Sequence, residues 1–510
     1  MAFIDAQALP DDSLLEADIV IIGGGMAGIT IARQFIDSDR RVLVLEAGGR
    51  ELDMAAQQFY VGSAVVSGPG NPDRMLDRYP AETRARVLGG SGMIWGGKCV
   101  PLDPADFEAR DWIPYSGWPL GRRDLQPYYD RACDLLEIPR FDDGEAEANG
   151  ALEAGPDFFS APRCFSRLSG GVDRAAFDRF RTAFAEAPNI DVCLNANVMR
   201  LGLAQEGDRI DQLDVACLNG RRHRVRGRTV ILAAGGIENV RLMLVSNDRE
   251  PRGVGNRNDL VGRFFQAHVV YALNGDTEMA GAAVQISGQR DLTLYANPDR
   301  RAAHCVFATR LAGQKRLRTG NFTLTLVPGT GPEPPGDAGE ETGAIGHLAA
   351  GVDGAASPGA LLPCFMMAEH LPNPESRIVL GETRDALGMP RIHMAWTYSQ
   401  ADFDGLEASV AAFGDGIGAS GTGRVCWPAR RERLVAMGVA SRHHMGTTRM
   451  HADPRQGVVD ADARVHGLDN LYIAGSSVFP TSGIANPTLT LMALAIRLAD
   501  HLKQGEGAGR

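Results

Sequence analysis

The sequence predicts an α/β fold in which two domains are interleaved along the chain. Three observations support this prediction. An apolar run at 17–22, a glycine-rich turn, a helical stretch and a second apolar run together form a βαβ unit. Strand-like runs recur in 191–240, and a strand followed by a long amphipathic helix begins near residue 470. Residues 271–440 have strand patterns of their own, so they are assigned to a second domain.

The elements of the first domain follow from the spacing of apolar residues. The run ADIVII at 17–22 is typical of a strand buried on both faces. Residues 29–37 have helical character, and RVLVLEAG at 41–48 is the second strand. Near the end of the chain, LYIAGSSVFP at 471–480 is predicted to be a buried strand, and a helix begins at Pro487. Three further strands are expected at 197–204, 210–218 and 229–236.

The second domain is expected to be α+β and built on an antiparallel sheet. FTLTLV, RIVLGE and RIHMAWTY are strand patterns, and a helix is expected near DFDGLEASVAAF. Residues 326–360 are rich in Gly, Pro and Ala, and this composition favours a long loop. Glu375 and Arg377 are expected to be a solvated or structural pair at the start of one of these strands.

Composition and charge exclude several classes of protein. The apolar fraction of 44% and the charged fraction of 23% are ordinary for a soluble globular chain. The net charge is −11 with dispersed Lys and Arg, which argues against a nucleic-acid surface and a polybasic membrane patch. No apolar run suits a membrane span, and the N-terminus lacks the features of a signal peptide. A cytoplasmic location is expected, although an export signal on a partner subunit would leave no trace here.

The eight cysteines are scattered, and no two of them lie within twenty positions of each other. This spacing fits neither a metal site nor an iron–sulfur cluster. It also fits no compact disulfide framework. No metal ion is therefore expected.

A glycine motif lies between the first predicted strand and its helix. Gly23, Gly25 and Gly28 spell G-x-G-x-x-G, and Glu46 ends the second strand 18 residues after Gly28. In this arrangement the first glycine permits a tight turn, the second lets backbone approach a pyrophosphate, and the third allows close helix packing. The helix N-terminus supplies N–H groups and a positive dipole end, and Glu46 can accept from ribose hydroxyls. The motif predicts a dinucleotide site without separating FAD from NAD.

The same spacing occurs once more, at Gly416, Gly418 and Gly421. That copy follows a helical stretch rather than a strand. It is therefore expected to be a helix-ending loop, which shows how little the spacing means without its context.

A second group of chemistry-bearing residues lies in the C-terminal part. Residues 441–450 read SRHHMGTTRM, and Asn486 directly precedes Pro487, a residue suited to the first turn of a helix. The positive end of that helix could stabilise negative charge on a reduced flavin ring. A histidine beside an amide suits alcohol oxidation, because imidazole removes the hydroxyl proton while the amide orients the hydroxyl. A histidine pair alone would more often be structural; the flanking GTTRM and the Asn-Pro helix start favour catalysis.

Together these motifs resemble the glucose–methanol–choline (GMC) oxidoreductases. The βαβ unit, HHMGTTRM and NPTLT carry the resemblance, and further segments extend it. RVLGGSGMIWGG at 86–97 resembles the flavin-contacting loop of the family. The sugar-oxidising branch of the family is matched by the segments 117–132, 233–239 and 261–268. This branch includes pyranose oxidase, glycoside 3-oxidase and sugar dehydrogenase large subunits. The matches span residues 18–500. They imply a Rossmann-like FAD-binding domain of GMC type interleaved with the substrate domain.

The resemblance assigns roles residue by residue. The catalytic histidine of the family lies three positions before the glycine of H-x-x-G-T, which is His443 before Gly446, so that His444 occupies a variable position. The second catalytic residue falls on Asn486, and Val198 matches a position whose backbone meets the adenine. The remaining positions implied to contact the cofactor, beyond the four residues of the first βαβ unit, are Gly90, Ser91, Trp95, Ala234, Gly475, Pro487 and Thr488. His268 is expected to be structural, because it lies at a different strand end.

The way in which the flavin is held also follows from the resemblance. Some members of the branch attach FAD through a histidine just before the tryptophan of the loop, and that place is Ile94 here. Non-covalent FAD is therefore expected. Some heteromeric sugar dehydrogenases carry an iron–sulfur cluster in this subunit. The cysteine spacing here lacks it, so electrons are expected to leave directly from the flavin.

The implied function is FAD-dependent oxidation of an alcohol CH–OH, such as a secondary hydroxyl of a sugar or glycoside, with oxygen or a quinone-like compound as acceptor. Two alternatives stay open: a non-redox member resembling hydroxynitrile lyases, and the flavin subunit of a heteromeric dehydrogenase. An NAD-dependent enzyme is disfavoured, because it would leave the C-terminal flavin-ring elements unexplained. A homo-oligomer or a small partner subunit is also open. The expected domains are FAD-binding parts at 1–110, 186–270 and 441–510, a connecting or lid segment at 111–185, and a substrate domain at 271–440.

Overall fold

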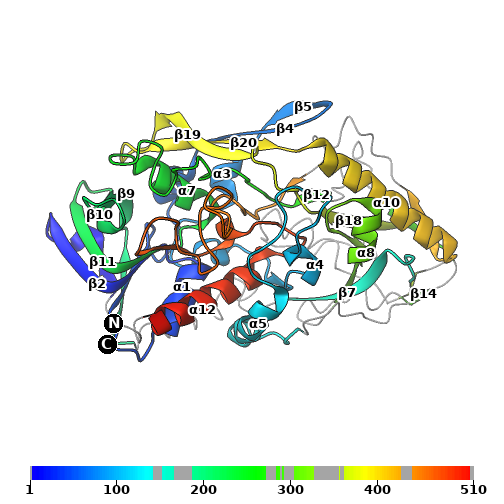
Figure 1. Cartoon of the computed structure of the whole chain (residues 1–510), viewed down its shortest axis with the longest axis horizontal. Helices are drawn as coiled ribbons and strands as arrows, with labels where there is room; N and C mark the ends of the chain where they lie inside the picture. Colours follow the sequence, from blue (N-terminus) through cyan, green and yellow to red (C-terminus); the bar gives the residue numbers. More distant parts are fainter. Residues whose placement is uncertain are drawn as a thin grey trace.

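The computed structural model describes most of the chain, including all of the C-terminal motifs. The described residues are 3–141, 152–165, 187–271, 283–287, 290–291, 304–326, 355–356, 361–426 and 439–505. Most of the predicted loop at 326–360 lies outside these residues. In Figure 1, helix α12 (Pro487–Gly505) lies in the lower part of the molecule, and helix α10 (Gln400–Ala419) lies at the right-hand end of the long axis.

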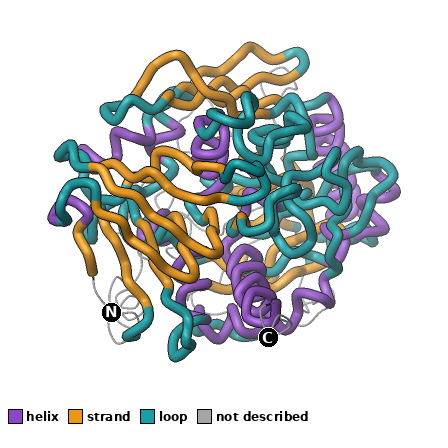
Figure 2. The backbone as a smooth tube through the Cα atoms, turned by 60° about the vertical axis from the view of Figure 1, so that its left-hand side comes forward, coloured by secondary structure: helices purple, strands orange, loops and turns teal. Residues whose placement is uncertain are grey.

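An eight-stranded sheet has the order β1-β8-β3-β2-β11-β10-β9, with β23 paired to β11. Its central strand β2 (Ser13–Ile22) runs parallel to β3 (Val42–Leu45) and to β11 (Arg222–Leu232). The remaining strands are β1 (Phe3–Asp5), β8 (Ile190–Leu194), β9 (Asn197–Leu203), β10 (Ile210–Ala216) and β23 (Leu471–Ile473). Strand β10 is antiparallel to both of its neighbours, and the other pairs are parallel. Figure 2 shows such strands side by side next to the helix that leads to the C-terminus.

Helices α1 (Met26–Gln34), α5 (Arg122–Leu136) and α12 pack together beside this sheet. Helix α1 connects β2 to β3, as the βαβ pattern predicts. Helix α12 is buried over most of its surface. Its apolar residues that are at most 1% exposed are Leu489, Met492, Ala493, Ala495, Ile496, Leu498 and Ala499.

A nine-stranded sheet occupies the other end of the molecule. Its order is β21-β13-β18-β16-β15-β7-β6, and β12 joins it through β18 and β22. All of its strand pairs among the described residues are antiparallel. The strands are β6 (Lys98–Cys99), β7 (Phe158–Phe165), β12 (Val269–Tyr271), β13 (Ala283–Ile286), β15 (His304–Thr309), β16 (Phe322–Leu326), β18 (Leu361–Ala368), β21 (Gly423–Cys426) and β22 (Val439–Ala440).

A separate four-stranded sheet has the order β19-β20-β4-β5. Its strands are β4 (Ser63–Gly68), β5 (Asn71–Met75), β19 (Arg377–Arg384) and β20 (Pro390–Thr397). Strand β20 runs parallel to β4, which comes from a distant part of the chain. FTLTLV therefore belongs to a different sheet from RIVLGE and RIHMAWTY. Apolar alternation identifies a strand but does not choose its neighbours.

Shorter elements complete the described structure. They are α2 (Met54–Gln57), α3 (Tyr79–Glu82), α4 (Pro104–Phe107), α7 (Gly235–Val245), α8 (Leu311–Leu317) and the pair β14 (Arg290–Asp291) and β17 (Ala355–Ala356). Within the described part of the chain, no helix combines the length and the apolar character that crossing a bilayer requires.

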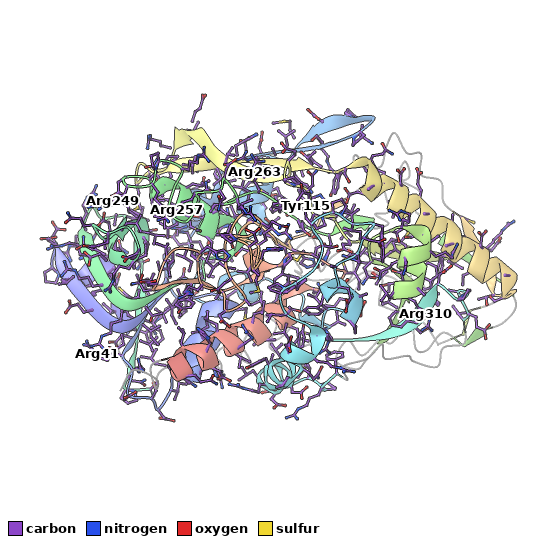
Figure 3. All side chains as sticks on the ribbon, in the orientation of Figure 1. Arg41, Tyr115, Arg249, Arg257, Arg263 and Arg310 are labelled. Atoms are coloured by element: carbon purple, nitrogen blue, oxygen red, sulfur yellow. The ribbon has the colours of Figure 1, made fainter. Side chains whose placement is uncertain are left out.

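Three local predictions need correction or refinement. The strand expected over 471–480 ends at Ile473, because Gly475 turns the chain at φ +126° and a 3-10 turn follows at Ser476–Val478. The second glycine motif lies at the end of α10, as its context indicates. Glu375 and Arg377 do not pair with each other: Glu375 accepts from Arg263 at 3.3 Å, and Arg377 lies 3.4 Å from Asp259. Figure 3 labels Arg263 near the yellow strand β19, which begins at Arg377.

Candidate active site

Backbone contacts in the glycine turn between β2 and α1 leave no room for a side chain at Gly23 or Gly28. Gly23 has φ +110°, and a Cβ there would lie 2.6 Å from the carbonyl oxygen of Ala233. A Cβ on Gly28 would collide with the carbonyl oxygen of Gly23. Gly25 caps α1 in an extended conformation, and a Cβ there would meet nothing closer than Gly90, at 3.9 Å. Two glycines thus serve packing, and the third keeps open space at the helix N-terminus.

Glu46 lies directly behind this turn. Its Oε2 accepts from the Gly24 N–H at 2.8 Å, and its Oε1 accepts from the Gly48 N–H at 2.7 Å. Burial raises the pKa of this carboxyl against the effect of those hydrogen bonds and of Arg86. The carboxylate therefore braces the turn, while its contact with a ribose stays a prediction.

The loop at 86–97 packs against the same turn. The Gly89 N–H donates to the Gly24 carbonyl at 2.8 Å, and Gly25 and Gly89 form a parallel β-bridge. Gly90 follows with φ +55°. Ser91 is exposed and Trp95 is half-buried, and both lie in or just after the 3-10 turn at Gly90–Met93. The loop is thus placed where it could meet a ligand at the N-terminus of α1.

The other predicted cofactor positions are distributed over four elements. Ala234 caps α7, and its N–H donates to Asn239 Oδ1 at 2.9 Å. Gly475 has an open face, since a Cβ there would meet nothing within 4 Å. Pro487 begins α12 with Thr488 next to it. Val198 is half-buried on the outer strand β9, and its adenine contact stays a prediction.

The structure brings His443 and Asn486 together. Asn486 lies just before α12, and its Nδ2 is 3.1 Å from His443 Nε2. Its Oδ1 is buried without a hydrogen-bond partner among the described residues. A buried acceptor of this kind is costly unless a ligand satisfies it. The pair therefore has the geometry that the sequence predicts, with a vacant amide acceptor beside it.

His268 lies on the other side of His443. The Nδ1 atoms of the two rings are 2.8 Å apart, the rings are almost perpendicular, and His268 Nε2 lies 3.2 Å from the carbonyl oxygen of Ser482. The two histidines are 175 residues apart, and the Gln266–Met445 bridge joins their segments. Sequence reasoning assigned His268 a structural role, and no local pattern indicates this contact.

Burial keeps this histidine group neutral. Burial lowers the pKa of His443 well below its ordinary value, and His268, His444 and Lys98 lower it further. Burial also lowers the pKa of His268 to about 4. Both rings are therefore uncharged near pH 7, and each must place a single proton on one of its two nitrogens.

His444 faces away from this pair. It lies 3.2 Å from Thr83 Oγ1, contacts the rings of Tyr79 and Phe265, and is 8% exposed. Burial lowers its pKa to about 3. The side chain thus packs against Thr83, Tyr79 and Phe265, and the backbone carbonyl of His444 accepts a hydrogen bond from Ser476 Oγ at 2.7 Å. This environment is that of an anchor that holds the segment in place.

A buried polar network supports the loop that leads to Asn486. Trp118 Nε1 donates to Thr481 Oγ1 at 2.8 Å, and that hydroxyl donates to the Asp106 carbonyl at 2.7 Å. Arg110 binds Glu369 through two hydrogen bonds of 2.7 and 2.8 Å. Burial, with nearby Asp103 and Glu369, raises the pKa of the Asp106 carboxyl well above its usual range.

The arrangement is compatible with a bound dinucleotide cofactor. Open glycine faces at Gly25, Gly475 and Gly235 and the unsatisfied Asn486 Oδ1 are the observations that support this fit. In the described residues, no three His, Cys, Asp or Glu side chains are grouped so that they could hold a metal ion.

Residues 372–495 match the family model described as GMC oxidoreductase. This C-terminal segment is a GMC oxidoreductase domain. Three relatives align with nearly the whole length of the chain. The 6'''-hydroxyparomomycin C oxidase of Streptomyces lividus is 26% identical over 96% of this chain and 93% of its own. The paromamine 6'-oxidase of Streptomyces fradiae is 27% identical over 94% and 90%. The fructose dehydrogenase large subunit of Gluconobacter japonicus is 26% identical over 96% and 99%.

Solved structures of similar shape support the fold. Pyridoxine 4-oxidase from Mesorbium loti has a TM-score of 0.56 at 19% identity, covering 95% of this chain and 99% of its own. A formate oxidase has a TM-score of 0.60 at 16% identity, covering 98% and 100%. The likeness to these structures shows a mixed α/β fold with several sheets. The family match and the relatives above identify an oxidoreductase of the kind that binds FAD and acts on CH–OH groups.

Proposed function

We propose that this GMC oxidoreductase oxidises a secondary hydroxyl of a sugar or glycoside to a carbonyl. The observation that supports the proposal is the 3.1 Å contact between His443 Nε2 and Asn486 Nδ2, with Asn486 Oδ1 buried beside it. A base and an amide this close together can both contact the same substrate hydroxyl group.

Bound FAD would supply the two-electron acceptor for the carbon-bound hydrogen. The residues proposed to hold it are the glycines of the α1 turn, the 86–97 loop, Val198, and the positions Ala234, Gly475, Pro487 and Thr488. Glu46 is proposed to reach the ribose. The N-terminus of α12 directs its N–H groups and positive dipole end toward the region before Pro487. There it would stabilise negative charge that develops on the ring.

His443 is proposed to be the general base. Its lowered pKa keeps it unprotonated at neutral pH, so it can accept the hydroxyl proton without first losing one. Asn486 orients the hydroxyl through its amide. His443 is half-buried, and the fully buried His268 shields the Nδ1 side of its ring from water.

The substrate class is proposed from the names of the relatives. They include a fructose dehydrogenase large subunit, a paromamine 6'-oxidase and a C-glycoside 3-oxidase from Microbacterium trichothecenolyticum that is 27% identical over 62% of this chain. The paromamine and fructose enzymes align along more than nine-tenths of the chain, so sugars and glycosides are the first compounds to test.

An anaerobic screen tests this proposal. The purified flavoprotein is mixed with fructose, paromamine, C-glycosides and pyridoxine while the visible flavin absorbance is followed. Bleaching by a sugar or glycoside is expected; bleaching by none of these compounds would contradict the proposal and favour a non-redox role. Admission of air then separates an oxidase, which forms hydrogen peroxide, from a dehydrogenase that needs another acceptor.

His443→Ala tests the assigned base. The rate constant of flavin reduction is expected to fall by about 10²- to 10⁴-fold, the usual contribution of a positioned base. His501→Ala is a matched control, because His501 is on the last turns of α12 and 38% of its side chain is exposed. An undiminished rate in His443→Ala would show that another group takes the proton.

We also propose that FAD is held without a covalent bond. Ile94 follows the 3-10 turn of the 86–97 loop and offers no nucleophile at the place where the branch uses histidine. Acid precipitation should release all flavin into the supernatant. Flavin that stays with the precipitated chain would contradict this.

A second candidate is the flavin subunit of a heteromeric dehydrogenase. The match to the fructose dehydrogenase large subunit over 99% of that protein favours it. The isolated chain would then reduce an artificial acceptor poorly although its flavin is bleached by substrate. Rapid turnover of the isolated chain with such an acceptor would exclude this candidate.

The domain division is proposed on the same basis. The eight-stranded sheet with α1 and α12 would form a Rossmann-like FAD-binding domain, and the nine-stranded antiparallel sheet with α10 would form the substrate domain. The boundaries at 110, 185, 270 and 440 remain predictions. The four-stranded sheet combines strands from both sides of the boundary at 270.

A further inference from the structure

His268 is fully buried and makes its two polar contacts with groups of very different character. Its exposed fraction is 0%. Its Nε2 lies 3.2 Å from the carbonyl oxygen of Ser482, and its Nδ1 lies 2.8 Å from Nδ1 of His443. It follows Ala267 at the entry to β12, so backbone pairing on a strand end fixes its position.

These contacts determine where the protons lie. A carbonyl oxygen can only accept, so His268 Nε2 must be the protonated nitrogen. A neutral His268 then has a bare Nδ1, which accepts a hydrogen bond. The 2.8 Å contact therefore requires the proton on Nδ1 of His443. This leaves His443 Nε2 bare, and Nε2 is the atom that faces the Asn486 amide donor at 3.1 Å.

The chain of hydrogen bonds ends at a backbone group. It runs from the Asn486 amide to His443, from His443 to His268, and from His268 to the carbonyl of Ser482. A backbone carbonyl cannot pass a proton onward. A proton taken up by His443 Nε2 must therefore leave by the same face, so His268 orients the ring rather than transporting protons.

We propose that His268 is a positioning residue that holds His443 in the Nδ1–H tautomer, with its basic Nε2 presented to the substrate hydroxyl. The inference rests on the function proposed above for His443. It assigns a task to a residue outside the His443–Asn486 pair. It also explains why a second imidazole is buried behind the first.

A neutral orienting partner has a chemical consequence. A carboxylate at this place would fix the same tautomer but would also stabilise the imidazolium and raise the pKa of His443. His268 accepts the hydrogen bond without adding a negative charge. The titratable and charged groups whose charges act on the two rings are Lys98, His444, His370 and Glu369. The carboxylate of Glu369 is engaged by Arg110, which limits its effect.

Three variants of His268 separate orientation from simple packing. His268→Asn keeps an acceptor at the Nδ1 place, His268→Leu removes it, and His268→Asp makes it anionic. For His268→Leu, the rate constant of flavin reduction is expected to fall roughly 10- to 100-fold with little change in KM, because much of the base carries its proton on the wrong nitrogen. His268→Asn should stay within about threefold of wild type, since it keeps one hydrogen bond.

The pH profile gives a readout that packing alone would not move. In His268→Asp, the acid limb of the rate profile should shift upward by roughly one unit or more, because the carboxylate stabilises protonated His443. Equally slow Asn and Leu variants, or an unshifted limb in the Asp variant, would overturn the proposal. Thermal unfolding and flavin content of each variant show whether it is folded.

The tautomer itself can be measured without turnover. Two-bond proton–nitrogen spectra of histidine-labelled protein distinguish the two neutral forms, and His443→Ala assigns the signal. Wild type should show Nδ1–H at His443, and His268→Leu should show the other form or a mixture. An Nε2–H signal in wild type would overturn the proposal. If His443→Ala reduces its flavin as fast as wild type, the function proposed for His443 fails instead, whatever the spectra show.

Discussion

At the residue scale, the amide of Asn486 is the contact most open to a direct test. Its Nδ2 lies 3.1 Å from His443 Nε2, while its Oδ1 has no partner among the described residues. Asn486→Ala removes both groups without disturbing Pro487. We expect kcat/KM for the alcohol to fall about 10- to 100-fold, because an orienting hydrogen bond contributes about 1.5–3 kcal/mol. Stopped-flow flavin reduction measures this, and an unchanged rate would remove Asn486 from the site.

Arg110 and Glu369 form a buried ion pair whose two side chains are 1% and 0% exposed. Glu369→Gln leaves the Arg110 charge uncompensated, and we expect the free energy of unfolding to fall by about 3–5 kcal/mol. Chemical denaturation followed by circular dichroism measures the change. Asp134→Asn is the matched control, because it breaks the Arg140–Asp134 pair, whose side chains are 61% and 55% exposed. A solvent-exposed pair of this kind contributes little to stability, so equal losses in the two variants would contradict the prediction.

At the element scale, the turn between β2 and α1 separates a packing glycine from a ligand-facing one. Gly28→Ala would force a Cβ into the Gly23 carbonyl oxygen and push α1 from the sheet, so a large loss of stability is expected. In Gly25→Ala, the new Cβ would meet nothing closer than Gly90, at 3.9 Å, so we expect this variant to fold normally but to bind FAD more weakly. Melting temperature and flavin content measure the two effects. A Gly25→Ala protein with full flavin affinity would move the pyrophosphate site elsewhere.

The same elements show what local sequence determines. The βαβ unit and α12 were predictable, because apolar spacing and the Asn-Pro start are local signals. The pairing of β20 with β4 and the contact of His268 with His443 were not, since both join segments far apart in sequence. Gly475 also ended a predicted strand early, because apolar character does not reveal a turn at positive φ. The His443–Asn486 pair was predicted through the family motif rather than through periodicity.

At the scale of the whole molecule, buried neutral histidines make folding sensitive to acid. Burial lowers the pKa of His268 to about 4 and that of His444 to about 3. Unfolding returns each ring to its ordinary value of about 6.5, so below that pH the unfolded chain binds more protons than the native one. The stability that these groups contribute is therefore present above about pH 6.5 and is lost as pH falls toward about 4 and then about 3.

Each of these histidines lowers the free energy of unfolding by up to about 1.4 kcal/mol for each pH unit in that window. His444→Phe removes one such group and keeps an aromatic ring near Tyr79 and Phe265. It gives up the Thr83 contact, so at pH 8 the variant should be equal to or less stable than wild type. Between pH 6 and 4, however, the slope of its unfolding free energy should be smaller by about one proton. Denaturant titrations at several pH values give both slopes. Parallel slopes would mean that His444 is already protonated in the folded protein, and its place as a neutral anchor beside His443 would have to be abandoned.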